Sequence, residues 1–174
     1  MNERFKAPSR ASLFLIVFGV VILDALTKQV VIARLPLGAS VQVLPKLLHV
    51  VHYENPGAAF NVFSASANGV GFGLLVLFSC LAVIVVTVLL CRSRSIRKAT
   101  IGLALVLGGA IGNLAERLLH GAVVDFIDVS VRSHHWPAFN VADSAIVLGA
   151  VLILLDLLSK PVDIEGPSAV DSPR

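Results

Sequence analysis

Four long apolar runs, separated by more polar stretches, dominate the pattern of this 174-residue chain. The runs cover residues 11–33, 69–91, 99–119 and 139–158. A helix needs about 20 mostly apolar residues to cross a bilayer. Each run is about that long, and the second contains no charged residue. The pattern therefore predicts an all-α membrane protein built on a bundle of four transmembrane helices.

Basic residues near the ends of the runs indicate the orientation of the helices, because they favour the cytoplasmic side. The tail 1–10 and the link 92–98 are the basic segments, with Arg4, Lys6, Arg10, Arg92, Arg94, Arg97 and Lys98. The only Lys or Arg residues in the longer loops 34–68 and 120–138 are Arg34, Lys46 and Arg132. We therefore expect both termini and the link to be cytoplasmic and the two loops to be periplasmic. The tail 159–174 is expected to be disordered.

The first run has an alternative interpretation, a cleavable secretory signal peptide. The basic tail and the apolar stretch 11–23 fit such a signal. No small-residue cleavage site follows directly, and removal of this run would leave three spans and upset the charge pattern. We therefore expect residues 11–33 to remain as the first transmembrane helix.

The two periplasmic loops contain short strand patterns. Residues 40–44 and 47–54 are rich in strand-forming residues, and residues 121–131 alternate as in a strand. The Asn-Pro-Gly sequence at 55–57 suits a type II turn. We expect a small β-rich cradle in these loops and a short amphipathic surface helix at 58–63.

Composition supports the membrane class and excludes several others. Hydrophobic residues make up 56% of the chain, charged residues make up 14%, and the mean hydropathy is +0.88. These values exclude an ordinary soluble globule and a disordered chain, and two cysteines exclude a disulfide scaffold. The net charge of +3 comes from scattered residues and residues beside the apolar runs, so no nucleic-acid partner is expected.

Several polar residues lie in or near the predicted spans, where they are costly and usually functional. At 1.5 Å per residue, Asp24 and Lys28 lie roughly 20 and 25 Å from the inner start of their helix. Asn113 and Arg117 lie roughly 20 and 27 Å along theirs, and Asp143 lies about 6 Å below the outer surface. The topology therefore gathers separate polar residues in the outer third of the membrane: Asp24, Lys28, Asn113, Arg117, Asp125, Asn140 and Asp143.

Most of these residues also have an ordinary structural interpretation. Asp24 and Lys28 are four residues apart on one helix face, and we favour an ion pair that fixes helix packing. Arg117 alone would extend to the membrane interface. Asn140 could cap the fourth helix, with Asp143 near the positive helix end, and this alternative stays open.

Asp125 and Asp143 are two carboxylates predicted at one membrane level. Close carboxylates cannot both ionise easily, so they share a proton. One can then act as general base on a water molecule while the other protonates a carbonyl, as in aspartic proteases. These two residues alone do not decide the matter, because Asp125 could also be an ordinary loop carboxylate.

Other chemistries find less support. His49 and His52 would face opposite sides of a strand, so we expect no metal site there. Cys80 and Cys91 are too far apart for a redox pair. The third run contains glycines that indicate close helix packing: Gly102, Gly108, Gly109 and Gly112.

Five short motifs follow one another along the chain. They are Asp-Ala-Leu-Thr-Lys at 24–28, Asn-Pro-Gly-Ala-Ala-Phe at 55–60, Gly-Gly-Ala-Ile-Gly-Asn-Leu-Ala-Glu-Arg at 108–117, Gly-Ala-Val-Val-Asp-Phe at 121–126 and Phe-Asn-Val-Ala-Asp-Ser at 139–144. Together they resemble the motifs of lipoprotein signal peptidases, the type II signal peptidases of bacteria. The resemblance extends over roughly residues 13–158.

This resemblance implies an aspartic endopeptidase that removes the signal peptide of prolipoproteins, cutting just before the cysteine that carries a diacylglyceryl group. It implies Asp125 and Asp143 as the catalytic pair. The residues it places around the substrate are Asn55, Gly57, Ala58, Asn113, Arg117 and Asn140. The residues it places in support of the site are Asp24, Lys28, Gly109, Phe139 and Ala142. Glu116 departs from the family, which usually has Asp there, and we expect it to alter only the local packing.

The resemblance also implies a place and partners for the chain. These are the bacterial inner membrane, diacylglyceryl prolipoproteins and membrane lipids, with a monomeric protein, an active site near the periplasmic face and no metal or organic cofactor. The main alternative is a small four-span proton-coupled transporter in which Asp24 titrates. It leaves the motifs at 55–60 and 121–126 without a role. A noncatalytic assembly subunit is a further alternative.

Overall fold

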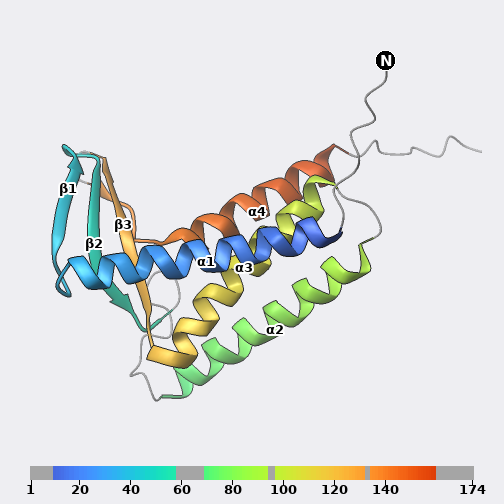
Figure 1. Ribbon diagram of the computed structural model, residues 1–174, viewed down its shortest axis with the longest axis horizontal. Helices are drawn as coiled ribbons and strands as arrows, with labels where there is room; N and C mark the ends of the chain where they lie inside the picture. The colour runs from blue at the N-terminus through green and yellow to red at the C-terminus, as the bar shows by residue number, and fades with distance from the viewer. Residues whose placement is uncertain (1–9, 58–68, 94–96, 132–133, 160–174) are drawn as a thin grey trace, which may run out of the picture.

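The computed structural model describes residues 10–57, 69–93, 97–131 and 134–159. Its helices are α1 (Arg10–Arg34), α2 (Val70–Arg92), α3 (Lys98–His120) and α4 (Val141–Leu158), and its strands are β1 (Ser40–Leu44), β2 (Leu48–Asn55), β3 (Val123–Val131) and β4 (His134–His135). The helices form a bundle, and the sheet stands at one end of it, beside the C-terminal end of α1 (Figure 1). The surface helix predicted at 58–63 lies outside the described residues.

All four helices are long and apolar enough to cross a membrane, which confirms the predicted class. Many of their large apolar side chains point away from the protein. On α2, for example, Leu77, Phe78 and Ile84 are between 52% and 58% exposed. An exposed apolar surface of this extent is compatible with lipid and not with water. The protein is therefore a multi-pass membrane protein.

The central helix is α3, which contacts each of the other three helices. Its closest approach is to α4, where a methyl group at Gly102 would lie 2.5 Å from the carbonyl oxygen of Gly149. A methyl group at Gly109 would overlap the carbonyl oxygen of Ala142. The glycines of this run therefore serve close helix packing, as predicted, and they hold the first turn of α4 directly against α3.

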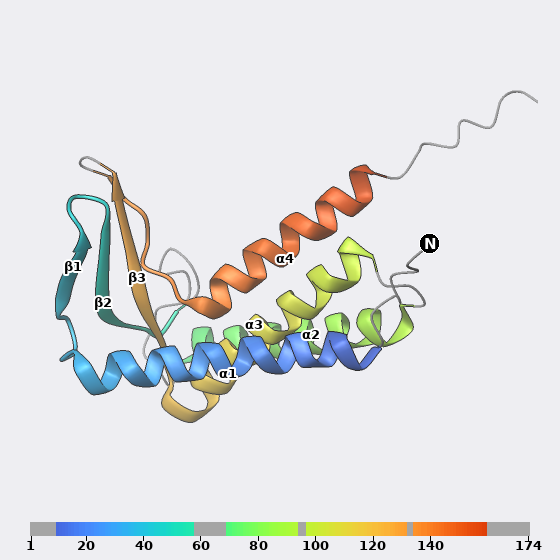
Figure 2. The ribbon, with the colours of Figure 1, turned by 45° about the horizontal axis from the view of Figure 1, so that its top comes forward.

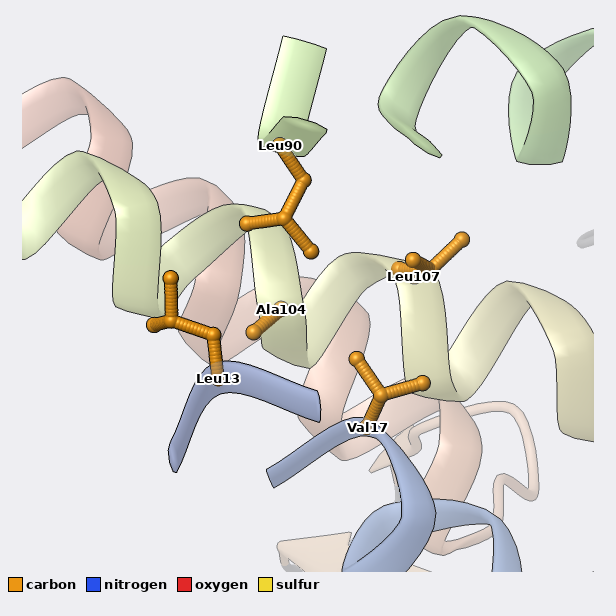
Figure 3. Packing of buried hydrophobic residues seen from close by; sticks show 5 residues of the cluster. All are labelled: Leu13, Val17, Leu90, Ala104 and Leu107. Carbon is orange, nitrogen blue, oxygen red and sulfur yellow. The ribbon is translucent and has the colours of Figure 1, made fainter. Parts of the chain in front are cut away.

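A cluster of apolar side chains joins three helices at the end of the bundle away from the sheet. We call it the apolar cluster, and Figure 3 shows its members: Leu13 and Val17 of α1, Leu90 of α2, and Ala104 and Leu107 of α3. All five are at most 8% exposed. The cluster gives the bundle a small packed core even though most of its outer surface is left for lipid.

The strands form one antiparallel sheet in the order β1-β2-β3-β4. Its strands come from both predicted periplasmic loops, which confirms the β-rich cradle; only β4 was not predicted. After an irregularity in β2, Tyr53 lies opposite Asp125 of β3. Val124 and Phe126 of β3 pack with Val31 of α1. The sheet is thereby fixed to the C-terminal end of α1, close to the ends of α3 and α4 (Figure 2).

The chain between α3 and α4 turns sharply at both ends of β3. Gly121 ends α3 with a φ of +75°, a left-handed conformation that glycine adopts without strain. α4 begins at Val141, two residues after the start of the apolar run. The reason is that Phe139 exchanges backbone hydrogen bonds of 2.8 and 3.0 Å with Ile127, and Asn140 then caps the helix. A long-range strand contact therefore decides where this helix begins.

Candidate active site

Polar side chains from four elements meet where the sheet joins the start of α4. They are Asn55 at the end of β2, Asp125 on β3, Asn113 and Arg117 on α3, and Asn140 and Asp143 at the start of α4. Hydrogen bonds link these residues or place them around one cavity. Residues that the sequence predicts at one membrane level are thus neighbours in the fold.

Asn140 connects the two carboxylates. Its side-chain oxygen accepts the N–H of Asp143 at 2.9 Å, and the Asp143 carboxylate accepts the N–H of Asn140 at 3.2 Å. These bonds form a capping box at the start of α4. At its other end, the Asn140 amide donates to Asp125 Oδ1 at 2.8 Å. One amide therefore caps the helix and contacts the second carboxylate, so the cap alternative is correct but incomplete.

Asp125 is almost fully buried, with an exposure of 5%. Its carboxylate accepts hydrogen bonds from the side chains of Asn55 at 3.0 Å and Asn140 at 2.8 Å. The pKa of Asp125 is raised to about 6, chiefly by burial and also by the nearby charge of Asp143, against the lowering effect of both amides. A carboxyl group with a pKa near 6 can hold or release its proton close to neutral pH.

Asp143 also accepts a hydrogen bond from a side chain of α3. Asn113 Nδ2 donates to Asp143 Oδ1 at 2.8 Å. One turn further along α3, the Arg117 guanidinium lies 3.4 Å from the backbone carbonyl oxygens of both Asn113 and Gly57. Arg117 also lines the cavity in front of the carboxylates. Its Nε is buried and finds no hydrogen-bond partner among the described residues.

A buried ion-pair network lies beside the site. Lys28 is fully buried and bonds to Asp24 at 2.7 Å and to Glu116 at 2.8 Å. Its third contact is Asn113 Oδ1 at 3.2 Å. Asp24 also accepts the backbone N–H of Ala142 at 2.9 Å. The Asp24–Lys28 pair therefore fixes helix packing, as expected. Lys28 joins α1 to α3 next to Asn113, and Asp24 joins α1 to α4.

Glu116 is the member of this network that the sequence analysis did not place near the site. Besides Lys28, it accepts the backbone N–H of Val124 at 3.1 Å, the residue next to Asp125. Its spacing could have indicated this position, because Glu116 lies three residues after Asn113 and thus on the same helix face.

A cavity of about 600 Å³ opens in front of the carboxylates. Its polar end is formed by Asn55, Arg117, Asp125 and Asp143. Its apolar wall is formed by Val123, Trp136, Pro137, Ala138, Phe139, Ile146, Val147 and Leu148. Such a cavity suits a ligand with a polar backbone and a large apolar group.

The remaining predicted residues have structural contacts near the site. The N–H of Gly57 donates to the side chain of Asn55 at 3.0 Å, which closes the turn after β2. Gly109 packs against the first turn of α4, and Phe139 bonds to β3. Ala58 lies outside the described residues. Within the described ranges, no group of three His, Cys, Asp or Glu side chains is arranged to hold a metal ion.

Comparisons with known proteins agree with the motifs. A family model described as Signal peptidase (SPase) II matches residues 16–159. The lipoprotein signal peptidase of Solibacter usitatus is 40% identical over 137 residues, which cover 78% of this chain and 84% of that protein. That of Burkholderia thailandensis is 43% identical over 141 residues, which cover 81% and 84%.

Solved structures give the same result for the fold. One, described as a bacterial membrane enzyme, superposes with a TM-score of 0.76 at 29% identity and covers 87% of this chain and 94% of its own. A second, described in the same way, has a TM-score of 0.75 at the same identity. None of these findings supports the transporter alternative. The chain belongs to the signal peptidase II family.

Proposed function

We propose that this member of the signal peptidase II family removes the signal peptide of diacylglyceryl-modified prolipoproteins, with Asp125 and Asp143 as its catalytic pair. Family membership supports the reaction class, since the similar proteins are lipoprotein signal peptidases. One observation carries the pair: both carboxylates stand at the polar end of the same cavity and are joined through Asn140.

The pair cleaves the peptide bond with water. One carboxyl is protonated and the other ionised, because burial and proximity oppose two negative charges. The ionised carboxylate takes a proton from water, and the water oxygen attacks the scissile carbonyl carbon while the protonated carboxyl gives its proton to the carbonyl oxygen. The carboxyl that took the proton from water then gives it to the leaving nitrogen, the C–N bond breaks, and the other carboxylate takes back a proton from a hydroxyl of the intermediate. The products are a signal peptide with a free carboxylate and a lipoprotein with a free amino group on its cysteine.

The other site residues hold the pair and the substrate. Asn113 and Asn140 donate to the two carboxylates, and Asn55 supports Asp125. Arg117 presents its guanidinium at the polar end of the cavity and binds the peptide backbone there. The apolar wall along α4 accommodates the acyl chains of the diacylglyceryl group, so the lipid stays in an apolar environment while the peptide is cut. Gly57 borders the same region, since its carbonyl oxygen lies 3.4 Å from the Arg117 guanidinium.

A cleavage assay tests the proposal. Purified wild type, Asp125→Asn and Asp143→Asn are incubated in detergent with a diacylglyceryl prolipoprotein and a chelator. We expect wild type to cut before the lipidated cysteine and each variant to be slower by about 1,000-fold or more. Asp128→Asn is the matched control, because Asp128 is on the same strand but lies near His49 instead of the cavity. An inert wild type overturns the function, and an active Asp125→Asn or Asp143→Asn overturns the pair.

We place the cavity at the periplasmic face of the inner membrane, with both termini cytoplasmic and the protein monomeric. The support is charge, since Arg92, Arg97 and Lys98 lie at the end of the bundle away from the sheet (Figure 1). An impermeant maleimide tests this in spheroplasts. Exposed Cys91 at that end should react only after permeabilisation, whereas Ser40→Cys in a Cys91→Ser background should react at once. The reverse pattern would place the cavity in the cytoplasm.

A further inference from the structure

A second cavity, of about 330 Å³, lies on the other face of β3. Strand residues alternate between faces: Val123 and Asp125 line the first cavity, and Val124 lines the second with Ala122, which directly precedes the strand. The second cavity is otherwise lined by Gln29, Ile32, Glu54, Glu116 and His120. Glu116 is the residue that this lining shares with the buried ion-pair network. One carboxylate therefore connects the second cavity to the groups that hold the catalytic pair.

The Lys28 ammonium group has three N–H donors and three acceptors around it. The acceptors are oxygens of Asp24 at 2.7 Å, Glu116 at 2.8 Å and Asn113 at 3.2 Å. Since Lys28 is fully buried, a neutral water from the second cavity replaces the charged carboxylate of Glu116 only in part. Without Glu116, the ammonium group would move toward Asp24 and lose its direction toward Asn113.

The direction of Lys28 matters because it orients the amide of Asn113. A lysine is only a donor, so it requires the oxygen of the Asn113 amide to face it. The NH₂ of the same amide then faces Asp143, to which it donates at 2.8 Å. A turned amide would present an oxygen to the Asp143 carboxylate and repel it. The Lys28 contact, with a longer one of 3.4 Å from the Asn140 amide to the same oxygen, thus orients Asn113 so that Asp143 receives a hydrogen bond.

The second contact of Glu116 reaches the other carboxylate. The same oxygen, Oε2, accepts the backbone N–H of Val124 at 3.1 Å. Val124 precedes Asp125, and its own carbonyl accepts the Asn140 side chain at 3.3 Å. Glu116 therefore fixes the segment of β3 that carries Asp125 as well as the lysine that orients Asn113.

We infer that Glu116 is a positioning residue for the catalytic pair, acting on Asp143 through Lys28 and Asn113 and on Asp125 through the backbone of Val124. This inference rests on the proposed function. Misplacing a catalytic group by about 1 Å can cost about 100-fold in rate. The loss should appear in kcat and leave KM nearly unchanged, because Glu116 is not among the residues that line the substrate cavity.

Two variants of Glu116 test the inference in the cleavage assay. Glu116→Gln keeps the shape but removes the charge, and we expect kcat to fall about tenfold with KM within about twofold of wild type. Glu116→Ala removes the carboxylate, and we expect a fall in kcat of about 100-fold. Formate, added as a probe, should enter the space left at the second cavity and restore part of the kcat of Glu116→Ala. It should not restore Glu116→Gln, whose side chain still fills that space.

Matched controls separate the two hypotheses. Glu54→Gln alters the other carboxylate of the second cavity, which is exposed on β2, and should leave kcat unchanged. Asp143→Asn should remain inactive with formate. If the Asp125 and Asp143 variants are inactive but both Glu116 variants keep wild-type kcat, the inference fails and the proposed function stands. It also fails if folded Glu116→Ala gains nothing from formate, or if Glu116→Gln changes KM instead of kcat. An inert wild type overturns the proposed function itself.

Discussion

The two ends of the helical bundle are held together by opposite kinds of interaction. At the end away from the sheet, α1 and α3 meet in the apolar cluster, where Leu13, Val17 and Leu107 pack without charges (Figure 3). At the sheet end, the same two helices meet through Lys28 and Glu116, both charged. Apolar contact is non-directional, whereas a buried polar contact depends on matched donors and acceptors. The comparison teaches that apolar packing holds α1 and α3 together at one end, whereas charged groups orient the two helices at the other.

Removal of the central charge at the sheet end should have the largest effect. Lys28→Met leaves the buried Asp24 and the partly buried Glu116 without their cation, which should cost about 3–5 kcal/mol of stability and abolish cleavage. Thermal unfolding in detergent, followed by circular dichroism, measures the stability. Lys98→Met, an exposed lysine at the opposite end of α3, is the control and should change stability by less than about 0.5 kcal/mol. Equal losses in the two variants would contradict the comparison.

Truncation in the apolar cluster should separate stability from activity. Leu107→Ala removes a side chain that is 3% exposed and should cost about 2–5 kcal/mol. Activity per folded molecule should stay within about twofold of wild type, because Leu107 lies about 9 Å of helix before Asn113 and does not line the cavity. Unfolding midpoints and cleavage rates are measured on the same preparations. A fall in kcat without a fall in stability would show that the two ends are not independent.

Glycine substitutions along the α3–α4 contact should sharpen the comparison with a smaller effect. Gly109→Ala and Gly102→Ala both force α4 away from α3, at a cost of about 1–3 kcal/mol each. Only Gly109→Ala should also lower kcat, because it displaces the turn that carries Asp143. Gly19→Ala, where an added methyl group meets nothing within 4 Å, is the neutral control. An equal fall in kcat for Gly102→Ala would argue against this position dependence.

The smallest predicted effect is on the ionisation of Asp125. In Asp143→Asn, a negative charge that raises the pKa of Asp125 is removed, so the proton leaves more easily and the pKa should fall below about 6. The change should be modest because burial, the largest cause of the raised pKa, remains. Carboxyl carbon NMR of aspartate-labelled protein measures it, with Asp128→Asn as the control. An unchanged or higher pKa would mean that the two carboxylates do not interact.

The sequence predicted the four spans and the strands of the two loops, since both depend on local patterns of apolar residues. It also predicted that Asn113, Asp125 and Asp143 lie together, because helix rise and topology determine depth. The predicted start of α4, at residue 139, was two residues too early. The reason is that Phe139 forms a strand contact with Ile127 that no local pattern reveals. Long-range pairing likewise explains why β4 was not predicted.

The role of Glu116 could not be derived from local spacing alone. Its partners, Lys28 and Val124, lie on α1 and β3, and the spacing only indicated the face of α3 on which Glu116 lies. Asn140 shows the opposite case, because both its interpretations, as a helix cap and as a neighbour of Asp125, came from the sequence. What the sequence could not reveal is that one amide serves both at once.

The double use of Asn140 has a consequence for how the protein is made. The side chain that caps the start of α4 is also the one that connects Asp125 to Asp143. A nascent chain in which the first three spans are inserted but α4 is not yet wound has one carboxylate and no partner for it. On the proposed function, a protease assembled in this order cannot cut before its last helix is in place.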